Sequence, residues 1–126
     1  MGHTADNIRE NAELLALKAD DLEGIKEHFG TPAQYEKLAE ELLELHDELI
    51  SCLSGRMDLY KVLDEMADVQ IVLAPLAAAL GAEKYRRCFL DKISRTKMRI
   101  KSGYYGGTSD KVEGGHIGFD RCLAGE

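Results

Sequence analysis

The chain has 126 residues, 44% of them hydrophobic, and this length suits one small domain with a single core. Its net charge of −7 argues against a nucleic-acid-binding protein, and no uncharged apolar run is long enough to indicate a membrane span or a secretory signal. The three cysteines are far apart and form no C-x-x-C pair, which argues against a zinc site or a disulfide framework and favours a reduced, cytoplasmic location.

Charge is divided unevenly along the chain. Residues 1–83 carry 6 basic and 18 acidic side chains, whereas residues 84–101 carry 8 basic side chains and 1 acidic one. An acidic segment followed by a basic helix suits a metal site beside an anion site.

The first predicted helix has Asp6 or Asn7 as its cap and extends to about residue 28. Apolar side chains recur along it at spacings of three, four and seven residues, which is typical of one buried helical stripe. We expect Gly30 to end this helix, and we expect its role to be packing, including packing at a subunit interface.

The second predicted helix covers residues 31–53. Thr31 is the expected N-cap, Pro32 takes the first helical position, and Gln34 completes a capping box. Apolar residues lie on several sides of this helix, which indicates burial by more than one neighbour. In so small a chain, that pattern favours oligomerisation.

The third predicted helix covers residues 58–80, with a kink at Pro75 and a stop at Gly81. The second helix carries Glu41 and Glu44, and the third carries Glu65 and Asp68. At about 100° per residue, each acidic pair shares a stripe with apolar side chains instead of lying on a solvated face. Lys37 and Lys61 are the only bases on those two stripes.

Carboxylates grouped in an apolar setting repel one another and lose hydration. Leaving one of them ionised and unpaired there costs several kcal/mol or more. A divalent cation relieves this repulsion, and carboxylate oxygens are suitable ligands for Mg²⁺ or Mn²⁺. From spacing alone, ordinary surface acids on amphipathic helices remain the alternative.

The fourth predicted helix covers residues 82–102 and carries the basic segment. Lys92, Arg95 and Arg99 share one face of it at spacings of three and four residues. Their charge and geometry suit phosphate binding. The alternative is a solvated cationic face that stabilises the C-terminus of the helix.

Residues 34–45 followed by residues 64–69 resemble the MazG-type all-α nucleoside triphosphate pyrophosphohydrolases. The signature of that family is E-x-x-E, a spacer, and E-x-x-D, and the resemblance covers roughly residues 32–103. It implies an ion of Mg²⁺, with Mn²⁺ as a substitute, that binds the triphosphate. The implied metal ligands are Glu41, Glu44, Glu65 and Asp68.

The family often carries Lys-x-x-x-Asn-x-x-Arg after the acidic helices. Lys92 and Arg99 match the ends of this pattern, but Thr96 stands in place of the asparagine, so that position has no side-chain amide. The phosphates are expected to contact Lys92, Arg95 and Arg99. Gln34 is expected to reach the base or the sugar.

The expected fold is an all-α bundle of three to four helices, completed by a homodimer or a homotetramer. Residues 1–103 form the expected domain, and residues 104–126 form a glycine-rich tail. The expected reaction is Mg²⁺-dependent hydrolysis of an NTP or dNTP between its α and β phosphates, which gives a nucleoside monophosphate and pyrophosphate. Glu41 or Glu44 is the expected general base.

Three alternatives remain open. The first is a phosphoribosyl-ATP pyrophosphohydrolase, which shares the helical acidic motif. The second is a non-enzymatic helical oligomer that serves as a binding module. The third is a di-iron bundle, which is disfavoured because such bundles carry Glu-x-x-His on their helices. In this chain that motif occurs only at Glu113 and His116, in the predicted tail.

Overall fold

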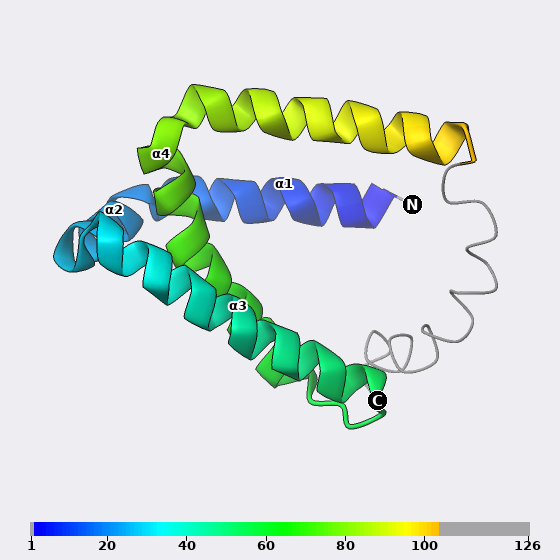
Figure 1. Ribbon diagram of the computed structural model, residues 1–126, viewed down its shortest axis with the longest axis horizontal. Coiled ribbons are helices and arrows are strands. Elements are labelled where there is room, and N and C mark those ends of the chain that lie inside the picture. The colour runs from blue at the N-terminus through cyan, green and yellow to red at the C-terminus, as the bar shows by residue number, and fades with distance from the viewer. Residues whose placement is uncertain (1, 104–126) are drawn as a thin grey trace.

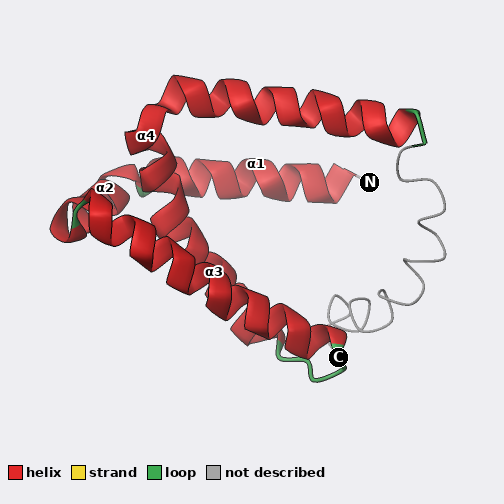
Figure 2. Ribbon diagram, viewed as in Figure 1, coloured by secondary structure: helices red, strands yellow, loops and turns green. Residues whose placement is uncertain are grey.

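The computed structural model describes residues 2–103, and this part of the chain is helical with no strand (Figure 2). Its four helices are α1 (Gly2–Leu17), α2 (Ala19–Phe29), α3 (Thr31–Leu53) and α4 (Leu59–Lys101). The all-α prediction is confirmed. The predicted tail, residues 104–126, lies outside the described residues.

The most extensive helix contact is between α3 and α4, and α2 packs on both of them. Figure 1 shows α3 beside the first half of α4, with the two helices joined by a short loop at one end. After Gly81, α4 continues as a second segment, residues 82–101, which we call the arm. The arm and α1 lie with their axes roughly parallel but run in opposite chain directions, and the arm diverges from α3 (Figure 1).

The core of the described residues lies between α3 and the first half of α4. Its buried apolar side chains are Cys52, Val62, Val69, Val72 and Leu76. Large apolar side chains nevertheless remain exposed on all four helices, among them Ile8 on α1, Leu43 on α3 and Phe89 on the arm. One chain therefore buries a small core and leaves apolar surface uncovered on every helix.

The prediction of one continuous first helix capped by Asp6 or Asn7 is wrong. Asp6 does not cap a helix, because α1 already begins at Gly2 and the Asp6 carboxylate accepts a hydrogen bond from Arg9 at 2.9 Å. The helix also breaks at Lys18, whose φ of −102° and ψ of 12° are not helical. This break allows α2 to change direction and pack on α3 and α4.

The predicted capping box at the start of α3 is also wrong. Gly30 is the N-cap, with φ of 82° and ψ of 160°, and no side chain caps the helix. A positive φ of this size favours glycine, so Gly30 both ends α2 and starts α3. The predicted end of α3 at Leu53 is confirmed.

The predicted start of the next helix is confirmed, since the Asp58 side chain accepts a hydrogen bond from the backbone N–H of Lys61 at 3.1 Å. Helical structure continues through Pro75, and the non-helical backbone occurs at Gly81, with φ of 142° and ψ of 90°. A side chain rarely tolerates that φ, so the glycine allows α4 to change direction there.

By length and composition, α4 is also long and apolar enough to cross a membrane. The core helix of a soluble protein meets the same criteria. Val69, Val72 and Leu76 of α4 are buried within this chain, but only 22% of the apolar window is buried.

Candidate metal centre

Four carboxylates converge where α3 packs on the first half of α4. Glu41 and Glu44 come from α3, and Glu65 and Asp68 come from α4. One oxygen of each lies within 4.8 Å of the others. We call this group the acidic centre. It consists of the four residues that the resemblance to the MazG-type family implied as metal ligands.

The antiparallel hairpin explains why these residues meet. Glu44 lies nine residues before the end of α3, and Asp68 lies nine residues after the start of α4. The short loop between the helices therefore brings the two residues to a similar level along the paired helices. A spacing of three then places Glu41 and Glu65 on the same faces as their partners.

The acidic centre has a buried side and an open side. The Glu41 side chain is only 6% exposed, Glu65 and Asp68 are half-buried, and Glu44 is exposed. The expectation that all four carboxylates lie among buried apolar residues is therefore wrong for Glu44. Helical periodicity identified the correct face of α3, but it did not indicate how far α4 covers that face.

The donor set fits a hard divalent cation. All four ligands are carboxylates, and oxygen donors are those that Mg²⁺ and Mn²⁺ prefer. Opposite ligands of Mg²⁺ lie about 4.2 Å apart, twice the usual Mg–O distance, so small side-chain rotations would bring these oxygens into range. Glu41 Oε2 and Glu65 Oε2 are also buried without a hydrogen-bond partner.

Mutual repulsion and loss of hydration raise the pKa of two carboxyl groups in the acidic centre. For Glu44, the main cause is the negative charge of Glu41, followed by loss of hydration and the charge of Glu65. For Asp68, the main cause is loss of hydration, followed by the charges of Glu41 and Asp64. Both groups therefore favour their protonated forms more than free side chains do.

These shifts predict an unusual effect of pH on stability in EDTA. A carboxyl group whose folded pKa is raised binds more protons in the folded chain, so folding gains stability as pH falls through that pKa toward the ordinary value of about 4. We expect Glu44→Gln to raise the melting temperature relative to the parent chain at pH 8, and to raise it less at pH 5. The control is Glu36→Gln, which removes an exposed charge of α3 outside the acidic centre. Equal gains for Glu44→Gln at both pH values would contradict the prediction.

Gln34 lies on α3 two helical turns before Glu41. Its side chain is 1% exposed, and its Oε1 atom is buried without a hydrogen-bond partner. The residue therefore sits in the packed interior of the chain and not on an open surface. Contact with a base or sugar remains a prediction, and it would require a substrate to reach this interior position.

The predicted phosphate ligands lie on the arm. Lys92, Arg95 and Arg99 are all exposed, and Arg95 forms an ion pair of 2.8 Å with Asp91. Because the arm diverges from α3 (Figure 1), a single chain does not bring these bases to the acidic centre. The base that does contact it is Lys37, whose Nζ lies 3.0 Å from Glu41 Oε1. The i,i+4 spacing of these two residues could have identified this contact.

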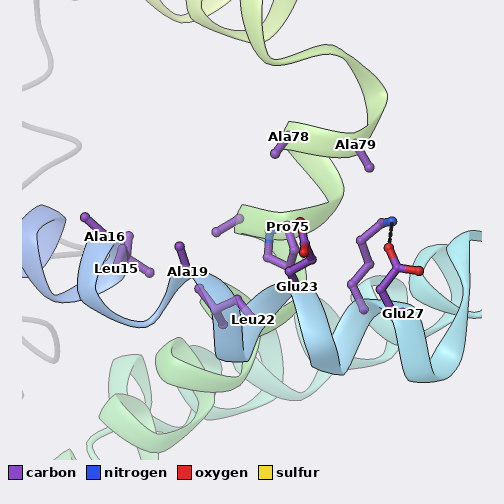
Figure 3. Close-up of a pocket in the computed structure, with 11 residues that line it drawn as sticks. Leu15, Ala16, Ala19, Leu22, Glu23, Glu27, Pro75, Ala78 and Ala79 are labelled. Atoms are coloured by element: carbon purple, nitrogen blue, oxygen red, sulfur yellow. Dashed lines mark hydrogen bonds and ion pairs between the residues drawn. The ribbon is translucent and has the colours of Figure 1, made fainter.

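A cavity of about 470 Å³ lies between the end of α1, α2 and the part of α4 that precedes Gly81 (Figure 3). Its walls are mainly apolar and include Leu22, Pro75 and Ala79, and Lys26 pairs with Glu27 at 3.4 Å on one side. None of the predicted site residues lines it. The cavity is therefore separate from the candidate metal centre.

Comparison with known proteins found no matching family model, no matching curated protein and no matching solved structure. The likeness to the MazG-type enzymes therefore remains a resemblance carried by the motif residues.

Proposed function

We propose that this chain is a Mg²⁺-dependent nucleoside triphosphate pyrophosphohydrolase of the MazG type. It would cleave an NTP or dNTP between the α and β phosphates, releasing a nucleoside monophosphate and pyrophosphate. The observation that carries the proposal is the convergence of one oxygen from each motif carboxylate within 4.8 Å. Two orphaned buried oxygens in the same group add support, because a cation would satisfy them.

The carboxylates would have distinct roles. Glu41 and Glu65, which hold the orphaned oxygens, would anchor the cation together with Asp68. Glu44 is the better placed of the two candidate bases, because it is exposed to solvent and its pKa is raised by Glu41. A bound cation would neutralise phosphate charge and make an attacking water more acidic.

We also propose that the protein acts as a homodimer or a homotetramer. A long groove between α1 and α4 is lined by Ile8, Leu15, Leu73, Tyr85 and Phe89, and much of this apolar surface is exposed. A helix such as the arm gains most of its stability from packing, so its uncovered apolar face is expected to pack against another molecule. Residues 1–83 carry a net charge of −12 and residues 84–101 carry +7, which makes a second copy of this chain the complementary occupant.

Phe89→Glu is expected to convert the oligomer to monomers, because it places a charge in the apolar groove. Size-exclusion chromatography with light scattering measures the outcome. Leu90→Glu is the matched control, since the adjacent Leu90 is exposed on the arm but does not line the groove. A parent chain that is already monomeric would contradict the proposed oligomer.

An oligomer would also bring the bases of the arm close to an acidic centre. With the arm of one copy placed over the acidic body of another, Lys92, Arg95 and Arg99 could neutralise phosphates bound near the acidic centre. We propose a cytoplasmic location with no nucleic-acid or membrane partner, on the basis of the acidic net charge and the cysteine pattern.

The test is product analysis with a panel of NTPs, dNTPs and modified dNTPs, with Mg²⁺ and with EDTA. We expect pyrophosphate and a nucleoside monophosphate from at least one substrate, with EDTA abolishing the reaction. Phosphoribosyl-ATP belongs in the same panel, because preference for it would favour the related pyrophosphohydrolase. Release of orthophosphate alone would contradict cleavage between the α and β phosphates. No release, together with no Mg²⁺ effect on melting, would favour the non-enzymatic module.

A further inference from the structure

Lys37 is placed to affect whatever binds at the acidic centre. Its Nζ lies 3.0 Å from Glu41 Oε1 and 3.5 Å from Glu40 Oε2. The Glu41 side chain is 6% exposed, whereas the Lys37 side chain is 48% exposed. The lysine therefore reaches from the surface to the most buried carboxylate of the group. A lysine ammonium group is charged at neutral pH, so Lys37 places a positive charge beside Glu41.

We propose that Lys37 makes cation binding at the acidic centre dependent on the nucleotide. Without nucleotide, its ammonium charge weakens cation binding by sharing the Glu41 carboxylate. With nucleotide, the same charge lies beside the phosphates and strengthens substrate binding. This inference rests on the proposed function and adds a positioning residue to it.

The electrostatic signs support both parts of this proposal. A unit positive charge several ångströms from a divalent cation repels it even in a water-like dielectric, and this repulsion is enough to weaken cation binding about five- to twentyfold. A triphosphate carries several negative charges. Once it is bound, the net interaction of Lys37 with the cation and the nucleotide is attractive instead of repulsive. Since Lys37 is half-exposed and has a flexible stem, its ammonium group can turn from Glu41 toward a phosphate oxygen.

Lys61 provides a matched control. It also comes from a helix that carries half of the acidic centre, and its Nζ lies 3.5 Å from Glu48 Oε1. Glu48, however, is not one of the four converging carboxylates. Removing the Lys61 charge therefore changes the net charge by the same amount without removing the contact with Glu41.

The experiment measures Mn²⁺ binding to the full chain by electron paramagnetic resonance, without nucleotide. Lys37→Met is expected to tighten Mn²⁺ binding about five- to twentyfold, and Lys61→Met is expected to change it less than about twofold. Lys37→Arg retains the charge and should bind Mn²⁺ as the parent chain does. The effect of Lys37→Met should shrink at high salt, because screening weakens the repulsion.

The second measurement is steady-state hydrolysis with Mg²⁺ held at saturation. Lys37→Met is expected to raise KM for the nucleotide at least about fivefold, with a smaller change in kcat, and Lys37→Arg should restore most of the loss. Tighter metal binding combined with weaker nucleotide binding is the pattern that a purely structural role would not produce.

The outcomes separate this inference from the proposed function. Mn²⁺ binding that is unchanged or weaker in Lys37→Met would overturn the role of Lys37 and leave the metal centre intact. An unchanged KM in the same variant would also overturn it. If neither the parent chain nor any variant binds Mn²⁺, the proposed function fails and this inference fails with it.

Discussion

Glu41→Gln is expected to lower the rate of pyrophosphate release by about a hundred- to a thousandfold. The substitution keeps the size of the side chain but removes the charge of the most buried carboxylate in the acidic centre. The loss should appear in kcat, because the carboxylate acts on the reacting phosphates through the cation it holds. Steady-state assays of pyrophosphate release at saturating Mg²⁺ measure the effect.

Glu40→Gln is the matched control for this prediction. Glu40 precedes Glu41 in the sequence and contacts Lys37 as Glu41 does, but its side chain is 60% exposed and lies outside the acidic centre. The Glu40→Gln chain should retain activity within about threefold of the parent chain, as expected for an exposed charge. A Glu41→Gln chain with full turnover would show that the four carboxylates do not form the catalytic site.

Replacing the three bases Lys92, Arg95 and Arg99 of the arm with alanine is expected to lower kcat/KM by about a hundredfold or more. These side chains supply positive charge to a substrate that the acidic centre alone would repel. The control replaces Lys84, Arg87 and Lys101 of the arm, none of which lines the groove, and it removes the same charge from the same helix. In this control, kcat/KM should fall less than about tenfold, since only long-range attraction is affected. Equal losses in the two triple variants would contradict specific phosphate contacts.

Mixing two inactive variants tests whether the bases act from a second copy. Chains with Glu41→Gln and chains with the Lys92, Arg95 and Arg99 substitutions would be unfolded together, refolded and assayed. In a random mixture, a two-fold symmetric dimer with shared sites should recover about a quarter of the parent activity. No recovery would mean that each chain supplies both its own carboxylates and its own bases.

The acidic centre could be predicted from sequence because its geometry follows from local rules. A spacing of three sets two carboxylates side by side on each helix, and the short loop between Leu53 and Leu59 fixes how the helices pair. The bounds of α3 and the start of α4 were predictable for a similar reason, since Gly30 and Ser54 act through the local backbone and the Asp58 side chain caps its own helix.

The depth of burial and the path of the chain were not predictable in the same way. Periodicity indicates which face of α3 is apolar, but the exposure of Glu44 depends on where α4 and α2 end their coverage. The break at Lys18 has no glycine or proline to mark it, although it is what allows α2 to pack on α3 and α4. The separation of the arm from α3 depends on the dihedral angles of Gly81, which spacing does not specify.

The central claim is that the four carboxylates form a cation site. Its most direct test is a Mn²⁺ titration of the full chain, alongside chains carrying Glu41→Gln or Asp68→Asn. The expected result is saturable Mn²⁺ binding to the parent chain that each substitution weakens at least about tenfold, with Mg²⁺ competing for the same site. Absence of saturable binding, or binding that neither substitution weakens, would contradict the claim.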